Sequence, residues 1–188
     1  MNITSCGVRK YILGLLLLHV SFLLAQNAEQ PAQKEISRDS LLTLARAIMD
    51  SAGCRILVTV DENGKPHARE MAPFAPEEDY VIWLGTSQGS RKTKQIQQNP
   101  NVVVYYYESK GMSYVAVSGK ACLVNDAEKK AKYWTESWKR YYPNRDTDYI
   151  LIKVTPEQLE VLSYKYKLSW DPVTKAPRSV DFSPGKTN

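Results

Sequence analysis

The stretch from Gly85 to Lys92 carries the residue types that hold an anion. A strand-like apolar run ends there, small hydroxyl residues follow, and a helix-like run begins with Ser90, Arg91 and Lys92. The free N–H groups and the dipole at a helix start favour negative charge, whereas basic side chains are unfavourable there unless an anion is present. Arginine grips phosphate through paired hydrogen bonds, and lysine adds a point charge. The pattern predicts an anion site; a solvated helix start with incidental charges is the alternative.

Arg69 is a second basic residue that could join this site. It lies in a predicted strand shortly after the turn Asp61–Gly64. A cation in a strand commonly faces water. In a barrel, however, Arg69 could converge on the helix start that carries Ser90, Arg91 and Lys92. The residue alone leaves both interpretations open.

Other groups of reactive residues give weak signals. His67 is the only histidine after the first 25 residues, so a histidine metal cluster or a Ser-His-Asp triad has little support. A general base beside a cofactor is one interpretation of His67, and a surface position in a strand is the simpler one. Tyr105, Tyr106 and Tyr107 are typical of a strand with large side chains on both faces, since a nucleic-acid platform would require a basic groove.

Hydrophobic periodicity predicts the elements that position these residues. Capping residues from Ser37 to Ser40 precede a helix that ends at Gly53, and the period then changes to two. The Asn-Gly pair in Asp61–Gly64 predicts a hairpin. Strands are predicted at 56–60, 65–72, 79–85, 101–107 and 112–124, with a helix from Gly89 to Gln98 that Asn99-Pro100 closes.

The second half of the chain predicts a long helix and two more strands. Asn125 or Asp126 caps the helix and Pro143-Asn144 breaks it; its apolar stripe consists of Ala127, Ala131, Trp134, Trp138 and Tyr141. Strands at 148–155 and 158–166 flank a turn at Pro156. These elements predict a mainly β (α+β) fold, a six- to seven-stranded antiparallel barrel with short capping helices, over residues 37–168. Residues 169–188 are expected to form a loose or wrapping C-terminal tail.

The first 25 residues have the pattern of a secretory signal peptide. Two basic residues precede an apolar run, Tyr11 to Leu24, and Ala25 offers a small residue for cleavage. The run is short for a membrane anchor, which needs about 20 apolar residues; an uncleaved anchor is the alternative. Gln26 stands where a lipoprotein would need cysteine. We therefore expect export to the periplasm or the extracellular medium, no stable membrane anchor after cleavage, and a flexible lead-in at 26–36.

Composition narrows the classes of function. Hydrophobic residues make up 43% and charged residues 24% of the 188 residues, which is typical of a globular domain. The leader holds two of the 25 basic residues and none of the 20 acidic ones. The rest is too mildly basic to indicate nucleic-acid binding without a clustered patch. Cys54 and Cys122 remain after cleavage, and their apolar surroundings suit a disulfide and two free thiols equally.

The sequence resembles the pyridoxamine 5'-phosphate oxidase-like family of split barrels that bind flavin mononucleotide (FMN), in particular its general stress protein branch. The resemblance covers residues 40–166. Three segments carry it: Gly64-Lys65-Pro66-His67-Ala68-Arg69-Glu70-Met71, the stretch TSQGSRKTKQIQQNP at 86–100 with the strand NVVVYYY after it, and Thr155-Pro156-Glu157-Gln158. The order of strand, Ser-Arg-Lys, helix, Asn-Pro and strand is the most specific part.

A small barrel with a cofactor against one open edge needs a partner to cover it, so we expect a homodimer. The resemblance implies a set of cofactor contacts. Eight residues would contact FMN: Arg69, Glu70, Met71, Thr86, Ser87, Ser90, Arg91 and Lys92. The first three lie in a strand that would face the flavin through its backbone and its basic side chain. The hydroxyl groups would bind phosphate or ribityl oxygens, and the Ser-Arg-Lys group would hold the phosphate. The resemblance would also let Trp138 and Trp170 cover the ring, but the place of Trp138 on the apolar stripe favours core packing for that residue.

The predicted function is that of an FMN-dependent oxidoreductase acting on an unknown small molecule. The true oxidase of the family reads its substrate with a C-terminal Arg-x-His pattern, which the tail 169–188 lacks. Pyridoxamine phosphate is therefore not the expected substrate. Two alternatives stay open. One is a non-catalytic flavin or haem carrier outside the cytoplasm, for which His67 is the one histidine that could serve as axial ligand. The other is an interaction domain that has lost its cofactor, against which the intact Ser-Arg-Lys group argues.

Overall fold

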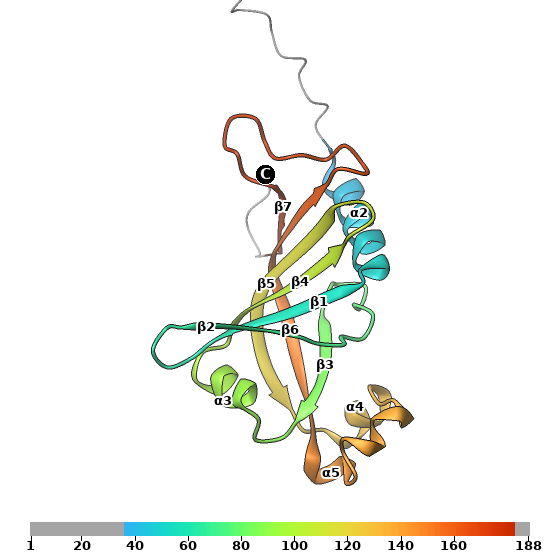
Figure 1. Cartoon of the computed structure of the whole chain (residues 1–188), viewed down its shortest axis with the longest axis vertical. Helices are drawn as coiled ribbons and strands as arrows, with labels where there is room; N and C mark the ends of the chain where they lie inside the picture. Colours follow the sequence, from blue (N-terminus) through green and yellow to red (C-terminus); the bar gives the residue numbers. More distant parts are fainter. Residues whose placement is uncertain (1–35, 183–188) are drawn as a thin grey trace, which may run out of the picture. The chain divides into compact units, whose positions relative to one another are not determined.

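Residues 36–182, the part of the chain that the computed structural model describes, contain seven strands that pair into one antiparallel sheet (Figure 1). The predicted antiparallel barrel with short helices is confirmed. The strand order is β2 (Pro66–Glu70), β1 (Cys54–Val60), β4 (Asn101–Glu108), β5 (Ser113–Val124), β6 (Tyr149–Ser163) and β3 (Ile82–Ser87), and β7 (Arg178–Asp181) pairs with β6. β7 lies within the segment that we expected to be a tail.

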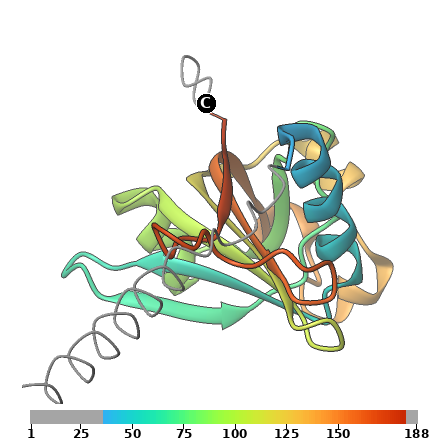
Figure 2. The ribbon, with the colours of Figure 1, turned by 90° about the horizontal axis from the view of Figure 1, so that it is seen from above.

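The helices cover different parts of this sheet (Figure 2). Helix α2 (Arg38–Ser51) begins at the predicted cap, Ser37, and packs against β4 and β5. Helix α3 (Arg91–Gln98) lies beside the β1–β2 hairpin. Three short helical segments gather where β3 and β6 meet: α4 (Ala127–Lys132), the 3-10 helix η1 (Glu136–Arg140) and α5 (Arg145–Asp148).

The core lies on one face of the central strands. Along β4 and β5, buried residues alternate with partly exposed ones, as the two-residue period of a strand requires. The largest side chains that are almost fully buried include Leu57, Val104, Tyr106, Val115 and Leu159. Burial of each aliphatic side chain in this set contributes roughly 1.5–3 kcal/mol. This core gives the neighbouring polar site a rigid base.

The hairpin between β1 and β2 sets the position of Arg69. The Asp61 carboxylate accepts hydrogen bonds from the backbone N–H groups of Asn63 and Lys65, both at 3.0 Å. Gly64 takes the left-handed conformation, with φ of 77°, which glycine adopts without strain. The predicted hairpin is confirmed, and its register places Arg69 opposite Leu57 on β1.

The single long helix predicted after Asp126 is wrong. Asp126 does cap a helix, but α4 ends at Lys132, and a 3-10 helix follows after a break. At the break, the Tyr133 side chain is buried, its hydroxyl binds Glu77, and its carbonyl accepts from the hydroxyl of Tyr149. The Tyr133 N–H still bonds the Lys129 carbonyl, but the Tyr149 hydroxyl occupies the Tyr133 carbonyl where the next turn of a helix would donate. These tertiary contacts outweigh the local periodicity.

The turn predicted at Pro156 is also wrong, because β6 runs through it without interruption. Proline cannot donate to a ladder, and in sheets it is confined to edges and bulges. The β5–β6 register shifts between Ser118 and Gly119, opposite Pro156. A Cβ on Gly119 would lie 3.0 Å from the Cα of Pro156 and still closer to the Thr155 carbonyl. The bulge and the glycine together accommodate the proline.

Cys54 and Cys122 are both free thiols. Cys54 pairs with Tyr107 on β4, whose partner on β5 is Tyr114, and Cys122 lies eight residues further along β5. At about 3.3 Å per residue the two cysteines are roughly 26 Å apart along the sheet. A disulfide needs Cα atoms within about 7 Å, so the two cannot bridge within one chain.

The predicted signal peptide at 1–25 and nearly all of the lead-in at 26–36 lie outside the described residues. Within residues 36–182, no helix has both the length and the apolar character that crossing a membrane demands.

Candidate phosphate-binding site

The Arg69 guanidinium is held by three neutral oxygens on the inner side of the β1–β2 hairpin. Its Nη1 donates to the Thr59 hydroxyl at 2.7 Å and to the Leu57 carbonyl at 3.1 Å, and its Nη2 donates to Oε1 of Gln95 at 3.3 Å. Thr59 is completely buried and Gln95 is 3% exposed. The acceptors fix the orientation of the arginine without neutralising its charge.

Lys92, in the first turn of α3, is also held by neutral oxygens. Its ammonium donates to the Thr86 hydroxyl at 2.8 Å and to the Ser90 hydroxyl at 3.4 Å. Thr86 is 2% exposed and lies on β3 opposite Ile150. Lysine thus reaches back from the helix to the strand, and the hydroxyl groups of Thr86 and Ser90 flank its charge.

The start of α3 differs from the starts of α2 and α4. Ser37 caps α2 and Asp126 caps α4 through side-chain hydrogen bonds, and both helices have an acidic residue in the first turn. Ser90 makes no such capping bond, and the first turn of α3 has Arg91 and Lys92 but no acidic residue. The N–H groups of a first turn need partners outside the helix. At α3 the Thr93 N–H donates to the Ser90 carbonyl at 3.1 Å, whereas no hydrogen bond within residues 36–182 takes up the N–H groups of Arg91 and Lys92. These two N–H groups remain available to an anion.

The positive charges of this corner destabilise one another. Burial lowers the pKa of Lys92, and the neighbouring Arg69 and Arg91 lower it further. Burial also lowers the pKa of Arg69, with an added effect from Arg91. Within residues 36–182, no carboxylate forms an ion pair with any of the three. An anion would relieve this repulsion, and a phosphate supplies both the charge and enough acceptor oxygens.

The structure gathers most of the predicted cofactor residues. Arg69, Thr86, Ser90 and Lys92 lie together, and Arg91 is close enough to lower the pKa of Arg69 and Lys92. We call these five residues the cationic cluster. Ser87 ends β3 on the loop that leads to this cluster. Two predicted residues are not gathered: Glu70 points to the opposite face of β2, and Met71 follows the end of the strand.

The two predicted ring-covering tryptophans lie apart from each other. Trp138 packs against Phe74 with ring centroids 5.5 Å apart and against Tyr149 at 5.9 Å, which is the core-packing role. Trp170 is 47% exposed, in the connection between β6 and β7.

Sequence reasoning missed Thr59 and Gln95, which orient Arg69. Nothing in the local pattern distinguishes Thr59 from other strand threonines. A signal for Gln95 did exist, because it falls beside Ile96 on the buried side of α3, where an amide requires a partner.

On the other side of β3 lies a cluster that we call the aromatic corner, formed by seven side chains: Phe74, Trp83, Tyr133, Trp134, Trp138, Tyr142 and Tyr149. Glu77 binds its edge, where it accepts from the Tyr133 hydroxyl at 2.6 Å and from Lys132 at 3.2 Å. The Tyr133 hydrogen bond holds the pKa of Glu77 down at about 2. The Trp83 indole N–H adds to this effect without forming a regular hydrogen bond, and Lys132 contributes less.

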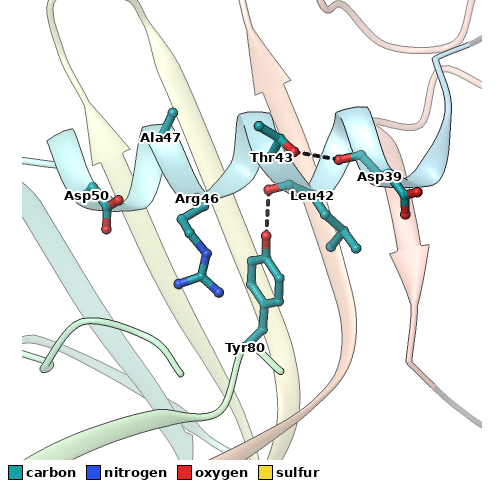
Figure 3. Close-up of a pocket in the computed structure, with 7 residues that line it drawn as sticks. All are labelled: Asp39, Leu42, Thr43, Arg46, Ala47, Asp50 and Tyr80. Carbon is teal, nitrogen blue, oxygen red and sulfur yellow. Dashed lines mark hydrogen bonds between the residues drawn. The ribbon is translucent and has the colours of Figure 1, made fainter. Parts of the chain in front are cut away.

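A hollow along helix α2 does not share these properties (Figure 3). Its arginine, Arg46, donates to the carbonyls of Pro76 at 2.9 Å and Glu77 at 2.7 Å, and Tyr80 donates to the Leu42 carbonyl at 2.6 Å. These contacts tie the loop before β3 to the helix. In the described part of the chain, no three His, Cys, Asp or Glu side chains gather as a metal site would need.

Known proteins resemble this chain in sequence and in fold. Residues 39–169 match the family described as pyridoxamine 5'-phosphate oxidase like. General stress protein 26 of Bacillus subtilis (strain 168) is 32% identical over 120 residues, which covers 62% of this chain and 84% of that protein. The crystal structure of general stress protein 26 from Bacillus anthracis str. Sterne is also 32% identical, with a TM-score of 0.57 over 65% of this chain and 93% of that one.

A more distant structure supports the fold alone. It is a pyridoxamine 5'-phosphate oxidase-related, FMN binding protein from Nostoc punctiforme PCC 73102, 15% identical, with a TM-score of 0.57 over 81% of this chain and all of that one. The family match spans well over half of the chain and includes every residue of the cationic cluster. The chain therefore belongs to the pyridoxamine 5'-phosphate oxidase-like family, within which its relatives are general stress proteins.

Proposed function

We propose that this protein binds FMN by its phosphate at the start of α3 and uses the flavin for redox chemistry on a small molecule. The carrying observation is that Arg69, Arg91 and Lys92 meet at an uncapped helix start with neutral partners only. The family membership and the FMN binding stated for the Nostoc protein support the flavin as the group that carries this phosphate.

The residues present fit the phosphate end of FMN. Arg69 and Lys92 supply fixed donors, and the first N–H groups of α3 supply further ones. When bound, the flavin would supply hydride and single-electron chemistry, while the protein supplies binding, orientation and electrostatics. The role of this chain at the site is to fix the phosphate and to favour ligands that carry one.

We propose that the substrate is a small molecule other than pyridoxamine phosphate. The C-terminal segment that would carry an Arg-x-His pattern lacks histidine. Its arginine in the described region, Arg178, begins β7 and lies 3.5 Å from Asp171 in an ion pair. That arginine is engaged in the fold, so the segment offers no free pair of groups to read a phosphorylated pyridine.

A haem carrier is less well supported. His67, the histidine of the described residues, has its Nε2 at 2.7 Å from Oδ2 of Asp61. That contact anchors the histidine to the hairpin turn. The cationic cluster, by contrast, has no counterion in residues 36–182. The observations therefore favour flavin over haem.

An absorption spectrum of the purified chain tests the proposal. We expect flavin absorption bands at about 370 and 450 nm after purification, or after addition of FMN and removal of the excess. A fluorescence titration should then show tighter binding of FMN than of riboflavin. A Soret band without flavin bands would identify a haem protein, and failure to bind FMN would overturn the proposal.

We further propose that the active form is a homodimer. On β1 and β4 the outward residues Ile56, Val58, Val103 and Tyr105 are apolar and only half-buried, and Tyr105 stacks on Tyr114 with ring centroids 5.2 Å apart. A sheet with one face in water normally presents polar residues there. An apolar outer face of this kind fits a second copy of the chain, because two-fold pairs bury the same patch twice.

Light scattering with FMN present tests the dimer. We expect a dimer for the wild type at micromolar concentration and dissociation for Val103→Asp, which places a charge in the face. Thr155→Asp adds the same charge at an exposed position on β6 and should leave the dimer intact. A wild type that remains monomeric would refute this arrangement.

Export completes the proposal. If residues 1–25 act as a signal peptide, the chain recovered from the periplasm or the medium should begin at Gln26 by mass spectrometry. A full-length chain recovered from the cytoplasm alone would contradict it.

A further inference from the structure

Two buried polar residues beside the phosphate-binding site have no obvious place in the core. Thr59 on β1 and Gln95 on α3 are 0% and 3% exposed. Polar side chains at such burial need hydrogen-bond partners, and leaving one unpaired destabilises the folded chain. Both find their partners in Arg69 and in each other.

The hydrogen bonds among these three residues form a closed set with fixed directions. Arg69 has only donors, so the Thr59 oxygen and the Gln95 oxygen must accept from it. The Thr59 hydroxyl then donates its single proton to Oε1 of Gln95, at 2.7 Å. The Gln95 amide can therefore adopt one orientation only, with its oxygen toward Arg69, because its NH₂ group would face other donors.

The neutral charge of Gln95 is the informative feature. A carboxylate in its place would have nearly the same shape and would also hold Arg69, through an ion pair at this distance. It would, however, cancel the positive charge. Gln95 fixes the Arg69 guanidinium and leaves its charge for a ligand. Because that charge stays unpaired, burial and the nearby Arg91 lower the pKa of Arg69.

We propose that Gln95, together with Thr59, is a positioning residue that sets the selectivity for a phosphate monoester over the same molecule without phosphate. The inference rests on the proposed function and adds to it a determinant outside the cationic cluster. Gln95 acts through Arg69 and does not touch the ligand.

The experiment compares FMN and riboflavin binding by fluorescence titration in wild type and variants, with the melting temperature of each ligand-free protein. Gln95→Glu should weaken FMN binding roughly 5- to 30-fold and change riboflavin binding less than about threefold. Its melting temperature should stay the same or rise, because Arg69 gains an ion pair. If Gln95 had a purely structural role, a variant that stays as stable as the wild type would keep the same ratio of FMN affinity to riboflavin affinity.

Matched variants isolate the effect. Gln97→Glu adds the same charge to α3 at an exposed position and should change FMN binding less than about threefold. Thr59→Val removes the bridging hydroxyl with little change in shape and should lower the ratio of FMN affinity to riboflavin affinity. Thr59→Ser keeps the hydroxyl and should keep the wild-type ratio. In an Arg69→Met background, Gln95→Glu should lose its effect on the ratio, because the two residues act as one unit.

The outcomes separate this inference from the proposed function. A wild type that binds neither flavin overturns both. A wild type that prefers FMN, together with a Gln95→Glu variant that prefers it equally, overturns the positioning role alone. Equal losses for FMN and riboflavin in Gln95→Glu would show that Gln95 serves the fold or the ring instead.

Discussion

The two sides of β3 treat charge in opposite ways. At the start of α3, Arg69 and Lys92 have only neutral acceptors, and burial together with nearby cations lowers the pKa of each. At the aromatic corner, Glu77 accepts from Tyr133 and pairs with Lys132 at 3.2 Å, and its pKa lies far below the usual range. One side carries unrelieved charge and the other carries satisfied charge, although both pack on the same strand.

This difference separates a candidate binding site from a structural joint. Satisfied hydrogen bonds and packed rings lower the free energy of the folded chain. Unrelieved positive charge raises it, and such strain persists where a ligand removes it. Substitutions in the aromatic corner should therefore change stability, and substitutions in the cationic cluster should change ligand affinity. Four measurements examine this contrast.

Arg91→Ala should give the largest effect, and on FMN affinity. Loss of one charge-assisted partner of the phosphate should cost roughly 1.5–3 kcal/mol, about a 10- to 150-fold loss. Riboflavin lacks the phosphate, so its affinity should change less than about threefold. Lys92→Ala should act in the same direction more mildly, because lysine is a point charge. Paired fluorescence titrations decide; no loss for either flavin would place the phosphate elsewhere.

Gly85→Ala should give the next largest effect, and on stability. A Cβ at this position would lie 2.6 Å from Cζ3 of Trp138 and 2.5 Å from Cε2 of Tyr149, inside the aromatic corner. Overpacking of this kind costs roughly 1–3 kcal/mol. Urea denaturation measures it. Gly53→Ala is the control, since a Cβ there meets no atom within 4 Å; similar losses for both variants would contradict the overpacking argument.

Glu77→Gln should lower stability by about 0.5–1 kcal/mol at neutral pH, a modest value because the side chain is partly exposed. The pKa of Glu77 is lowered from its usual 4.5 to about 2, so its contribution is present above pH 4.5 and is lost as the pH falls to about 2. The wild type and the variant should thus converge toward pH 2. Denaturation at a series of pH values checks this, and a difference that stays constant with pH would contradict it.

The smallest expected effect is that of Arg91→Ala on the stability of the ligand-free protein, which should rise. Without ligand, Arg91 is exposed, sits at the unfavourable end of the helix dipole and adds to the burden on Lys92. Its removal should stabilise the ligand-free protein by roughly 0.3–1 kcal/mol. A melting curve without flavin provides the measurement. If the ligand-free variant melted below the wild type, Arg91 would have a structural role and the contrast would weaken.

Much of the fold could be read from the sequence, because local signals agreed with the tertiary structure. Asp61–Gly64 forms the predicted hairpin, Ser37 caps the predicted helix, and Ser90 to Lys92 begin the next one. The errors occurred where tertiary contacts overrode local periodicity. Tyr133 gives up its helical position for Glu77 and Tyr149, and Pro156 passes through β6 because Gly119 makes room for it.

In the candidate site, too, local sequence signals specified some features and tertiary contacts specified the others. The sequence by itself determined the identity of the cations and the helix start that presents them, since both depend on residue types and short spacing. Only the tertiary structure decided which neutral groups hold them. Thr59 and Gln95 lie 36 residues apart, and they meet at Arg69 because a hairpin and a helix pack together. Hydrogen-bond partners across such distances follow from strand register and packing, which no short stretch of sequence contains.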